Sequence, residues 1–103
     1  MPYYVTLTNL TEQGRKTIKA RPERIREVNK ELTAMGGKIL AQYAVLGPYD
    51  FVTILEAENN DVIMGISVEL SARGTLQLMS LPALDIDKFI ARAWAPPSHG
   101  RER

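Results

Sequence analysis

Tyr49 and Asp50 are the neighbouring residues of this sequence best suited to chemistry, and they follow Gly47 and Pro48. An aspartate beside a tyrosine can act as a general base or can polarise the phenol. The same four residues are also typical of a tight turn, in which the carboxylate accepts hydrogen bonds from nearby backbone N–H groups. We favour the turn, and we keep Tyr49 and Asp50 as candidate catalytic or ligand-binding residues.

A second candidate site is basic and lies around Pro22. Lys19, Arg21 and Arg24 flank this proline, and a helix that breaks there leaves backbone N–H groups free. Such groups, together with three cations, are suited to hold a phosphate or a carboxylate. A solvated helix surface explains the same pattern, because glutamates are interspersed with the bases. Residues 1–40 carry eight Lys or Arg and four Asp or Glu, a net charge of +4, whereas residues 41–103 carry five and eight, a net charge of −3.

Aromatic side chains offer a third candidate site. Tyr3, Tyr4 and Tyr43 fall in segments that are typical of strands. Tyrosine phenols, together with Gln42, can orient an aromatic ligand between a sheet and its helices. Tyrosine in a strand more often packs in a core or an interface, and we favour that interpretation. Tyr43 is kept as a candidate ligand-binding residue.

The composition excludes several classes of chemistry. The 103 residues contain no cysteine and one histidine, His99, close to the C-terminus. Disulfides, thiolate metal sites and cysteine nucleophiles are therefore excluded, and a haem site would lack its usual axial histidine. We predict no cofactor and no metal site. We also predict no binding of nucleic acid, because the aromatic pattern of RNA-binding sheets is missing.

Length and hydropathy predict one cytoplasmic domain. A chain of 103 residues, 45% hydrophobic and 24% charged, is typical of a single globular unit. No apolar run approaches the roughly 18 residues that a membrane span needs, and the N-terminus does not resemble a signal peptide. We expect a folded domain over residues 1–93, a flexible tail over 94–103, and no contact with a membrane.

The order of the secondary-structure signals indicates the fold. Aromatic and β-branched residues predict strands at 3–8, 38–46, 51–56 and 75–81. Apolar residues three and four positions apart predict helices at 12–19 and 22–35, a helix that residues 59–61 cap and Gly74 ends, and a last helix at 85–93. This order, β-α-β-β-α-β with an added helix, is that of the ferredoxin-like α+β fold, in which the helices cover one face of an antiparallel sheet.

The uncovered face of that sheet predicts self-association. In the segment 38–46, Ile39, Ala41 and Tyr43 alternate with Leu40 and Gln42, so both faces of the strand are largely apolar. An apolar face that no helix of the same chain covers is best buried against a second copy. We expect a homodimer, or a larger ring, built through the open sheet face.

Several short motifs in a fixed order resemble the GYD domain family. Gly47-Pro48-Tyr49-Asp50, followed by Phe51, is similar to the Gly-x-Tyr-Asp signature of that family, with Pro48 at its variable position. The resemblance covers roughly residues 1–90 and extends to the opening strand, to Thr11–Gly14, Ile18–Lys19, Arg21–Arg24 and Gly36–Lys38. It implies a small bacterial or archaeal protein of the dimeric α/β-barrel group, and it implies no particular reaction.

Two functions from different classes remain open at this point. The first is a non-catalytic, oligomeric binding or regulatory module that holds a small anionic or aromatic molecule. The second is a cofactor-independent enzyme of the monooxygenase or isomerase kind, acting on an aromatic or lactone substrate that the tyrosines and Asp50 orient. We favour the first, because the sequence lacks the histidines that such chemistry commonly uses.

Overall fold

The sheet is built from four antiparallel strands, in the spatial order β2-β3-β1-β4. The structure is a computed structural model that describes residues 1–93, so Trp94, His99 and the predicted tail lie outside the described residues. Its elements are β1 (Tyr3–Leu10), α1 (Glu12–Ala20), α2 (Arg24–Ala34), β2 (Lys38–Ala44), β3 (Phe51–Glu56), α3 (Asn60–Ser71), β4 (Leu76–Ala83) and α4 (Ile86–Ala93). The ferredoxin-like α+β fold is confirmed.

Helices α1 and α3 begin where a side chain can satisfy a free backbone N–H group. Thr11 precedes α1 and accepts from the N–H of Gly14 at 3.1 Å, and Asn59 precedes α3 and accepts from the N–H of Val62 at 3.1 Å. Each cap of this kind typically contributes about 1 kcal/mol. The break at Pro22 is present, but α2 starts two residues later than predicted, at Arg24.

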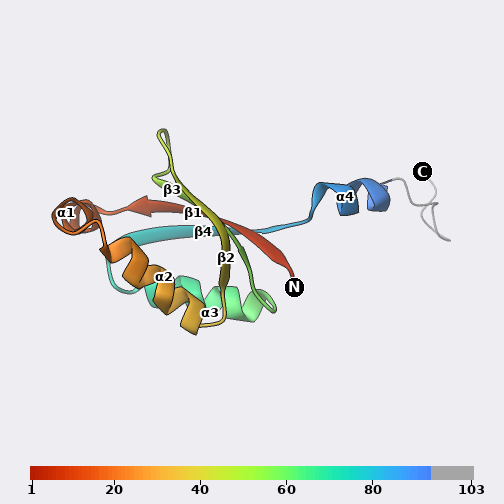
Figure 1. Ribbon diagram of the computed structural model, residues 1–103, viewed down its shortest axis with the longest axis horizontal. Helices are drawn as coiled ribbons and strands as arrows, with labels where there is room; N and C mark the ends of the chain where they lie inside the picture. Colours follow the sequence, from red (N-terminus) through yellow and green to blue (C-terminus); the bar gives the residue numbers. More distant parts are fainter. Residues whose placement is uncertain (94–103) are drawn as a thin grey trace.

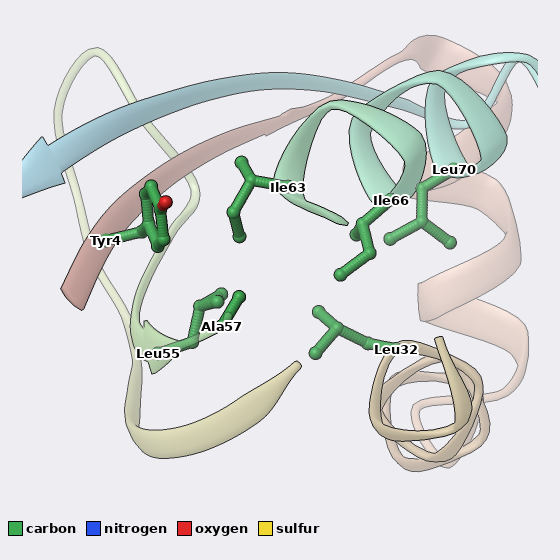
Figure 2. Close-up of a cluster of buried hydrophobic side chains, with 7 residues drawn as sticks. All are labelled: Tyr4, Leu32, Leu55, Ala57, Ile63, Ile66 and Leu70. Carbon is green, nitrogen blue, oxygen red and sulfur yellow. The ribbon is translucent and has the colours of Figure 1, made fainter. Parts of the chain in front are cut away.

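The core lies between the sheet and the helices (Figures 1 and 2). Figure 1 shows α2 and α3 on one side of the sheet, with α1 at one end. Tyr4 and Leu55 are the largest fully buried side chains and lie opposite each other on β1 and β3. The Tyr4 hydroxyl donates to Oδ1 of Asn60 at 2.6 Å, which joins β1 to the first turn of α3. The remaining buried apolar residues are Leu32, Ala57, Ile63, Ile66 and Leu70.

The face assignment of β2 differs from the prediction because of a β-bulge. Ile39 lies opposite Leu55 while Ala41 lies opposite Ile54, so the register shifts between Ile39 and Ala41. The extra residue turns the strand, and strict alternation fails there. Ile39 and Gln42 therefore face the helices, whereas Ala41 and Tyr43 face away from them. The strand also ends earlier than expected, at Ala44.

No element among residues 1–93 covers the other face of the sheet, which we call the open face. Strand pairing places Val5 opposite Ile54 and Leu7 opposite both Val52 and Met79 on this face. Several of its side chains are well exposed, most of all Tyr43, at 60%. The apolar open face is as the sequence predicted. It consists of Tyr3, Val5, Leu7, Ala41, Tyr43, Val52, Ile54, Met79 and Leu81.

The last described helix, α4, stands apart from the core. Figure 1 shows it beyond the end of the sheet, opposite α1. It contains no buried residue. Only Leu84 and Asp85 separate it from β4, and Asp85 holds its first turn by accepting from the N–H groups of Asp87 (3.0 Å) and Phe89 (2.9 Å).

Candidate functional site

Asp50 fastens the β2–β3 hairpin to the end of β1. Its N–H donates to the carbonyl of Thr8 at 2.9 Å, and its own carbonyl accepts from the N–H of Val45 at 2.9 Å. Its Oδ2 accepts from the N–H of Leu10 at 2.8 Å. All three hydrogen bonds hold Asp50 to neighbouring backbone. The carboxylate accepts from the N–H of Leu10, which has no partner on β3. The geometry is that of a structural clamp.

Tyr49 and Tyr43 lie on the side of the open face. Gly47 adopts φ +113°, in the region that favours glycine, and so turns the chain between β2 and β3. Tyr49 follows this turn and brings its hydroxyl to 4.0 Å from Sδ of Met79 on β4. Tyr43 projects from β2, opposite Val52. Tyr49 therefore lies beside Asp50 in sequence, but it reaches toward the open face, while the Asp50 carboxylate is held by Leu10.

Two of the three predicted anion-binding bases are paired with carboxylates. Arg21 and Arg24 both donate to the carboxylate of Glu27, Arg24 at 3.0 Å. The hydrogen bond from Arg24 and the charge of Arg21 lower the pKa of Glu27. Lys19 lies in the last turn of α1. An incoming phosphate would have to displace Glu27 to use both guanidinium groups.

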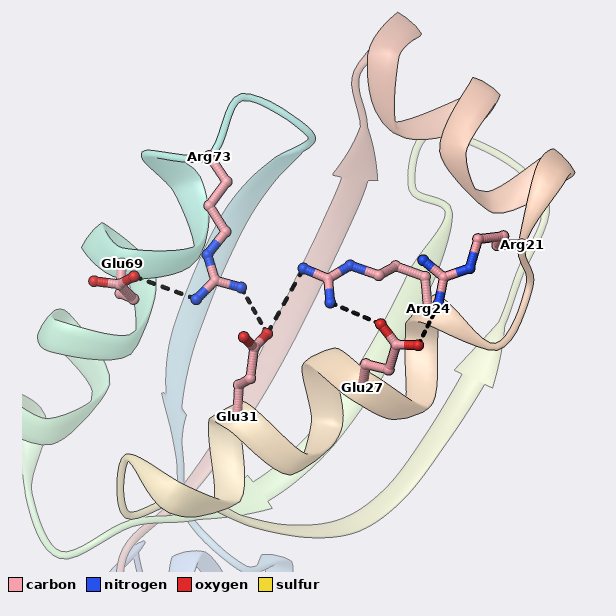
Figure 3. Close-up of polar contacts among 6 residues, drawn as sticks. All are labelled: Arg21, Arg24, Glu27, Glu31, Glu69 and Arg73. Atoms are coloured by element: carbon pink, nitrogen blue, oxygen red, sulfur yellow. Dashed lines mark hydrogen bonds and ion pairs between the residues drawn. The ribbon is translucent and has the colours of Figure 1, made fainter.

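The pairing continues as a chain of charges across two helices (Figure 3). Glu31 on α2 accepts from Arg73 at 2.6 Å and lies 3.9 Å from Arg24. Arg73 follows α3 and also donates to Glu69 at 3.2 Å, and these two bonds raise its pKa. The group, Arg21, Arg24, Glu27, Glu31, Glu69 and Arg73, holds three cations and three anions, so its charges cancel. It ties α2 to the end of α3.

Sequence reasoning missed this network. Arg73 lies 42 positions from Glu31, and only the fold brings the two together. Gln42 was predicted to orient a ligand, but its partners in the fold were missed for the same reason. On the helix side of the sheet, Gln42 exchanges two hydrogen bonds with Asn29 of α2, at 2.7 and 3.2 Å, and donates to the hydroxyl of Thr53 at 3.1 Å.

A cavity of about 70 Å³ lies between the sheet and the helices. Its walls are mostly apolar, but the threonines Thr6, Thr8 and Thr53 and the Gln42–Asn29 pair contribute polar atoms. Thr8 is only 7% exposed, and among residues 1–93 every fully buried side-chain nitrogen or oxygen has a hydrogen-bond partner. Neither Tyr49 nor Asp50 lines this cavity.

A neighbouring cavity of about 90 Å³ reaches the charge network. Its lining includes Arg24 and Arg73, and it shares Leu10, Ile18, Val28 and Leu76 with the first cavity. The two spaces are therefore adjacent. The arrangement has an apolar interior with a few hydroxyl and amide groups, and two guanidinium groups beside it.

Two further observations concern metal-ligating groups and the Asp50 carboxylate. Among residues 1–93, no three His, Cys, Asp or Glu side chains are grouped to hold a metal ion. The carboxylate of Asp50, which is next to Tyr49 in the sequence, accepts a hydrogen bond from the backbone N–H of Leu10. None of the described helices is long and apolar enough to cross a membrane.

Comparison with known proteins agrees with the fold and adds a relative. A protein from Thermus thermophilus described as "Glutamine synthetase and cystathionine beta-lyase binding protein" is 44% identical over 93 residues, which cover 89% of this chain and 98% of that protein. No solved structure gave a significant match. The model of the GYD domain matches residues 4–93, from the first strand through α4. The chain therefore belongs to the GYD family.

Proposed function

We propose that this protein is a self-associating, non-catalytic binding module that docks on a metabolic enzyme and regulates it. The observation that carries the proposal is the similarity to the Thermus protein, whose name describes the binding of glutamine synthetase and cystathionine beta-lyase. The match spans nearly the whole of that protein, so the likeness concerns complete domains. We propose enzymes of these two kinds as the partners of this chain.

The geometry around Asp50 supports a binding role over a catalytic one. A general base needs a carboxylate that is free to take a proton from a bound substrate. The Asp50 carboxylate instead accepts the N–H of Leu10 at 2.8 Å. The phenol of Tyr49 points to Met79. An enzyme on this scaffold would have to use other groups.

The surface that we propose for the partner enzyme is the tip of the β2–β3 hairpin, residues 45–50. Leu46 at this tip is fully exposed, at 101%, and Figure 1 shows the hairpin projecting from the sheet. A fully exposed leucine adds nothing to the core of its own chain, whereas in an interface it would bury apolar surface. Tyr49, two residues before β3, gives the tip an aromatic side chain.

The test is binding to purified glutamine synthetase and cystathionine beta-lyase from the same organism, measured by isothermal titration calorimetry. We expect saturable binding to at least one of them, and weaker binding by Leu46→Ser. The matched control is Val68→Ser, which removes an aliphatic side chain that is 63% exposed on α3. If neither enzyme binds the parent protein, the proposed function is wrong. If both variants bind equally well, the hairpin is not the docking surface.

A second candidate function, the binding of a small molecule, is favoured by the cavity. Thr6, Thr8 and Thr53 contribute hydroxyl groups to this largely apolar space, so a mainly apolar ligand would also find a hydrogen-bonding group there. The class of ligand is a small, mainly apolar molecule with one hydrogen-bonding group. Native mass spectrometry of the freshly purified protein tests it. A retained mass that Thr8→Val loses supports the site, and a bare protein mass opposes it.

A further inference from the structure

Within residues 1–93, the apolar side of α4 is left largely uncovered. Ile86, Phe89 and Ile90 lie at helical spacing on one side of α4 and are 64%, 55% and 47% exposed. The opposite side carries the charged residues Asp87 and Lys88. A soluble helix with one apolar side normally packs that side against a core. Here the core lies back along β4, and α4 extends beyond it.

The length of α4 makes this exposure costly. The helix has eight residues, whereas isolated helices shorter than about 12–15 residues are marginal in water. The cap from Asp85 helps the first turn but cannot replace the missing packing. The GYD domain model nevertheless extends through residue 93. Thus α4 belongs to the domain common to the family, and a surface that packs against it is to be expected.

The same chain carries a second unpartnered apolar surface, the open face. We propose that two copies exchange these surfaces, so that the segment 84–93, which we call the arm, packs its α4 against the open face of the other copy. A two-fold axis lets both arms dock at once, because each chain supplies one arm and one face. The inference rests on the self-association in the proposed function, and it assigns the residues that hold the two copies together.

The exposed area is of the size that a stable dimer needs. At about 150–250 Å² for an aromatic side chain, Tyr3, Tyr43 and Phe89 together expose roughly 300 Å² of their surface. A large aliphatic side chain has about 100–120 Å² of surface, as the transfer free energies imply. With their exposed fractions, five more residues together expose roughly 300 Å²: Met79, Leu81, Leu84, Ile86 and Ile90. The half-buried residues of the open face add to this total. It approaches the roughly 800 Å² per partner of a standard interface.

The continuity of the two surfaces favours a second copy over an unrelated partner. Leu81 and Ala83 lie on the open face at the end of β4, and the exposed Leu84 and Ile86 of the arm follow directly along the chain. A second chain related by two-fold symmetry presents the same strip running in the opposite direction. Each copy then covers what the other leaves exposed. A heterologous protein would have to match both surfaces separately.

The test uses one variant for each surface and one control. Phe89→Glu places a charge on the apolar side of α4, Met79→Glu places one on the open face, and Lys88→Glu changes the charged side of α4. Sedimentation velocity at micromolar concentration measures the assembly, and circular dichroism checks that each variant is folded. We expect the parent and Lys88→Glu to be oligomeric. In Phe89→Glu and Met79→Glu, the dissociation constant should rise at least about 30-fold, as for an interface hot spot.

Mixing the two defective variants decides whether the arm crosses to another copy. Phe89→Glu keeps an intact face and Met79→Glu keeps an intact arm, so an equal mixture should form a heterodimer with one complete arm–face contact. If both variants are monomers and the mixture stays monomeric, the arm does not dock on the face of a second chain and the inference is overturned. It is also overturned if Phe89→Glu remains oligomeric, in which case self-association survives without the arm. A monomeric parent overturns both the arm and the self-association in the proposed function.

Discussion

The clamp at Asp50 predicts a specific loss of stability when its carboxylate is removed. In Asp50→Ala the N–H of Leu10 loses the acceptor that lies 2.8 Å away, at a half-buried position. Loss of a hydrogen bond to a charged group typically costs about 1.5–3 kcal/mol. For a domain of this size, about 2 kcal/mol lowers the Tm by roughly 8–16 °C. Asp50→Asn keeps an oxygen in place, and we expect it to lose about half as much.

Urea unfolding followed by circular dichroism measures this effect. The midpoint should fall in the order parent, Asp50→Asn, Asp50→Ala, with unchanged m-values. Glu58→Ala serves as the control, because it removes an exposed carboxylate from the strand–helix junction. If Asp50→Ala unfolds at the urea concentration of the parent, the carboxylate is not a structural clamp. Unchanged stability with lost binding of the partner enzyme would instead make Asp50 a functional residue.

Further predictions concern two glycines and the charge network. Gly14→Ala should destabilise the protein by about 1–3 kcal/mol, because its Cβ would lie 2.1 Å from the carbonyl oxygen of Thr75. Gly65 has nothing within 4 Å of the position of a Cβ, so Gly65→Ala should stabilise helix α3 by about 0.5–1 kcal/mol. Equal effects of the two substitutions in thermal unfolding would refute the packing at Gly14. Arg73→Met should lower the free energy of unfolding by less than about 1 kcal/mol at low salt. Molar NaCl should remove most of this difference, because the ion pairs of Arg73 with Glu31 and Glu69 are partly exposed. A loss of stability that does not depend on salt would point to packing instead. The pKa of Glu27 is lowered in the folded protein, so its ionised form stabilises the fold above its ordinary pKa, and that stabilisation is lost as the pH falls through the lowered value. The penalty of Glu27→Gln, measured by urea unfolding, should therefore shrink from pH 7 to pH 3, and a penalty that grows in acid would contradict the pairing.

The order of the elements could be predicted from local signals. Capping residues such as Thr11 and Asn59, and the run of β-branched residues Val52, Thr53 and Ile54 in β3, act within a few positions of the chain. These signals can therefore be recognised in the sequence alone. The pattern of apolar residues on both sides of the strands likewise predicted the open face before any tertiary contact was considered.

The features that could not be predicted depend on residues far apart in the sequence. The bulge after Ile39 turns Gln42 toward Asn29 and Thr53, with which it forms hydrogen bonds, and nothing in the segment 38–46 alone signals those partners. The link between Arg73 and Glu31 requires the two helices to lie side by side. The basic cluster around Pro22 was predicted from local charge, but the carboxylates that face it come partly from another helix turn.

The hydroxyl and amide groups beneath the helices have a consequence for the temperature dependence of folding. Thr6, Thr8 and Thr53 are each at most 7% exposed, and Gln42 joins them on the same side of the sheet. Exposure of apolar surface on unfolding raises the heat capacity, whereas exposure of polar surface lowers it. A core that is partly polar therefore gives a smaller heat-capacity change than an aliphatic one of equal size. The free energy of unfolding is then expected to vary less with temperature than it would with an aliphatic core of equal size.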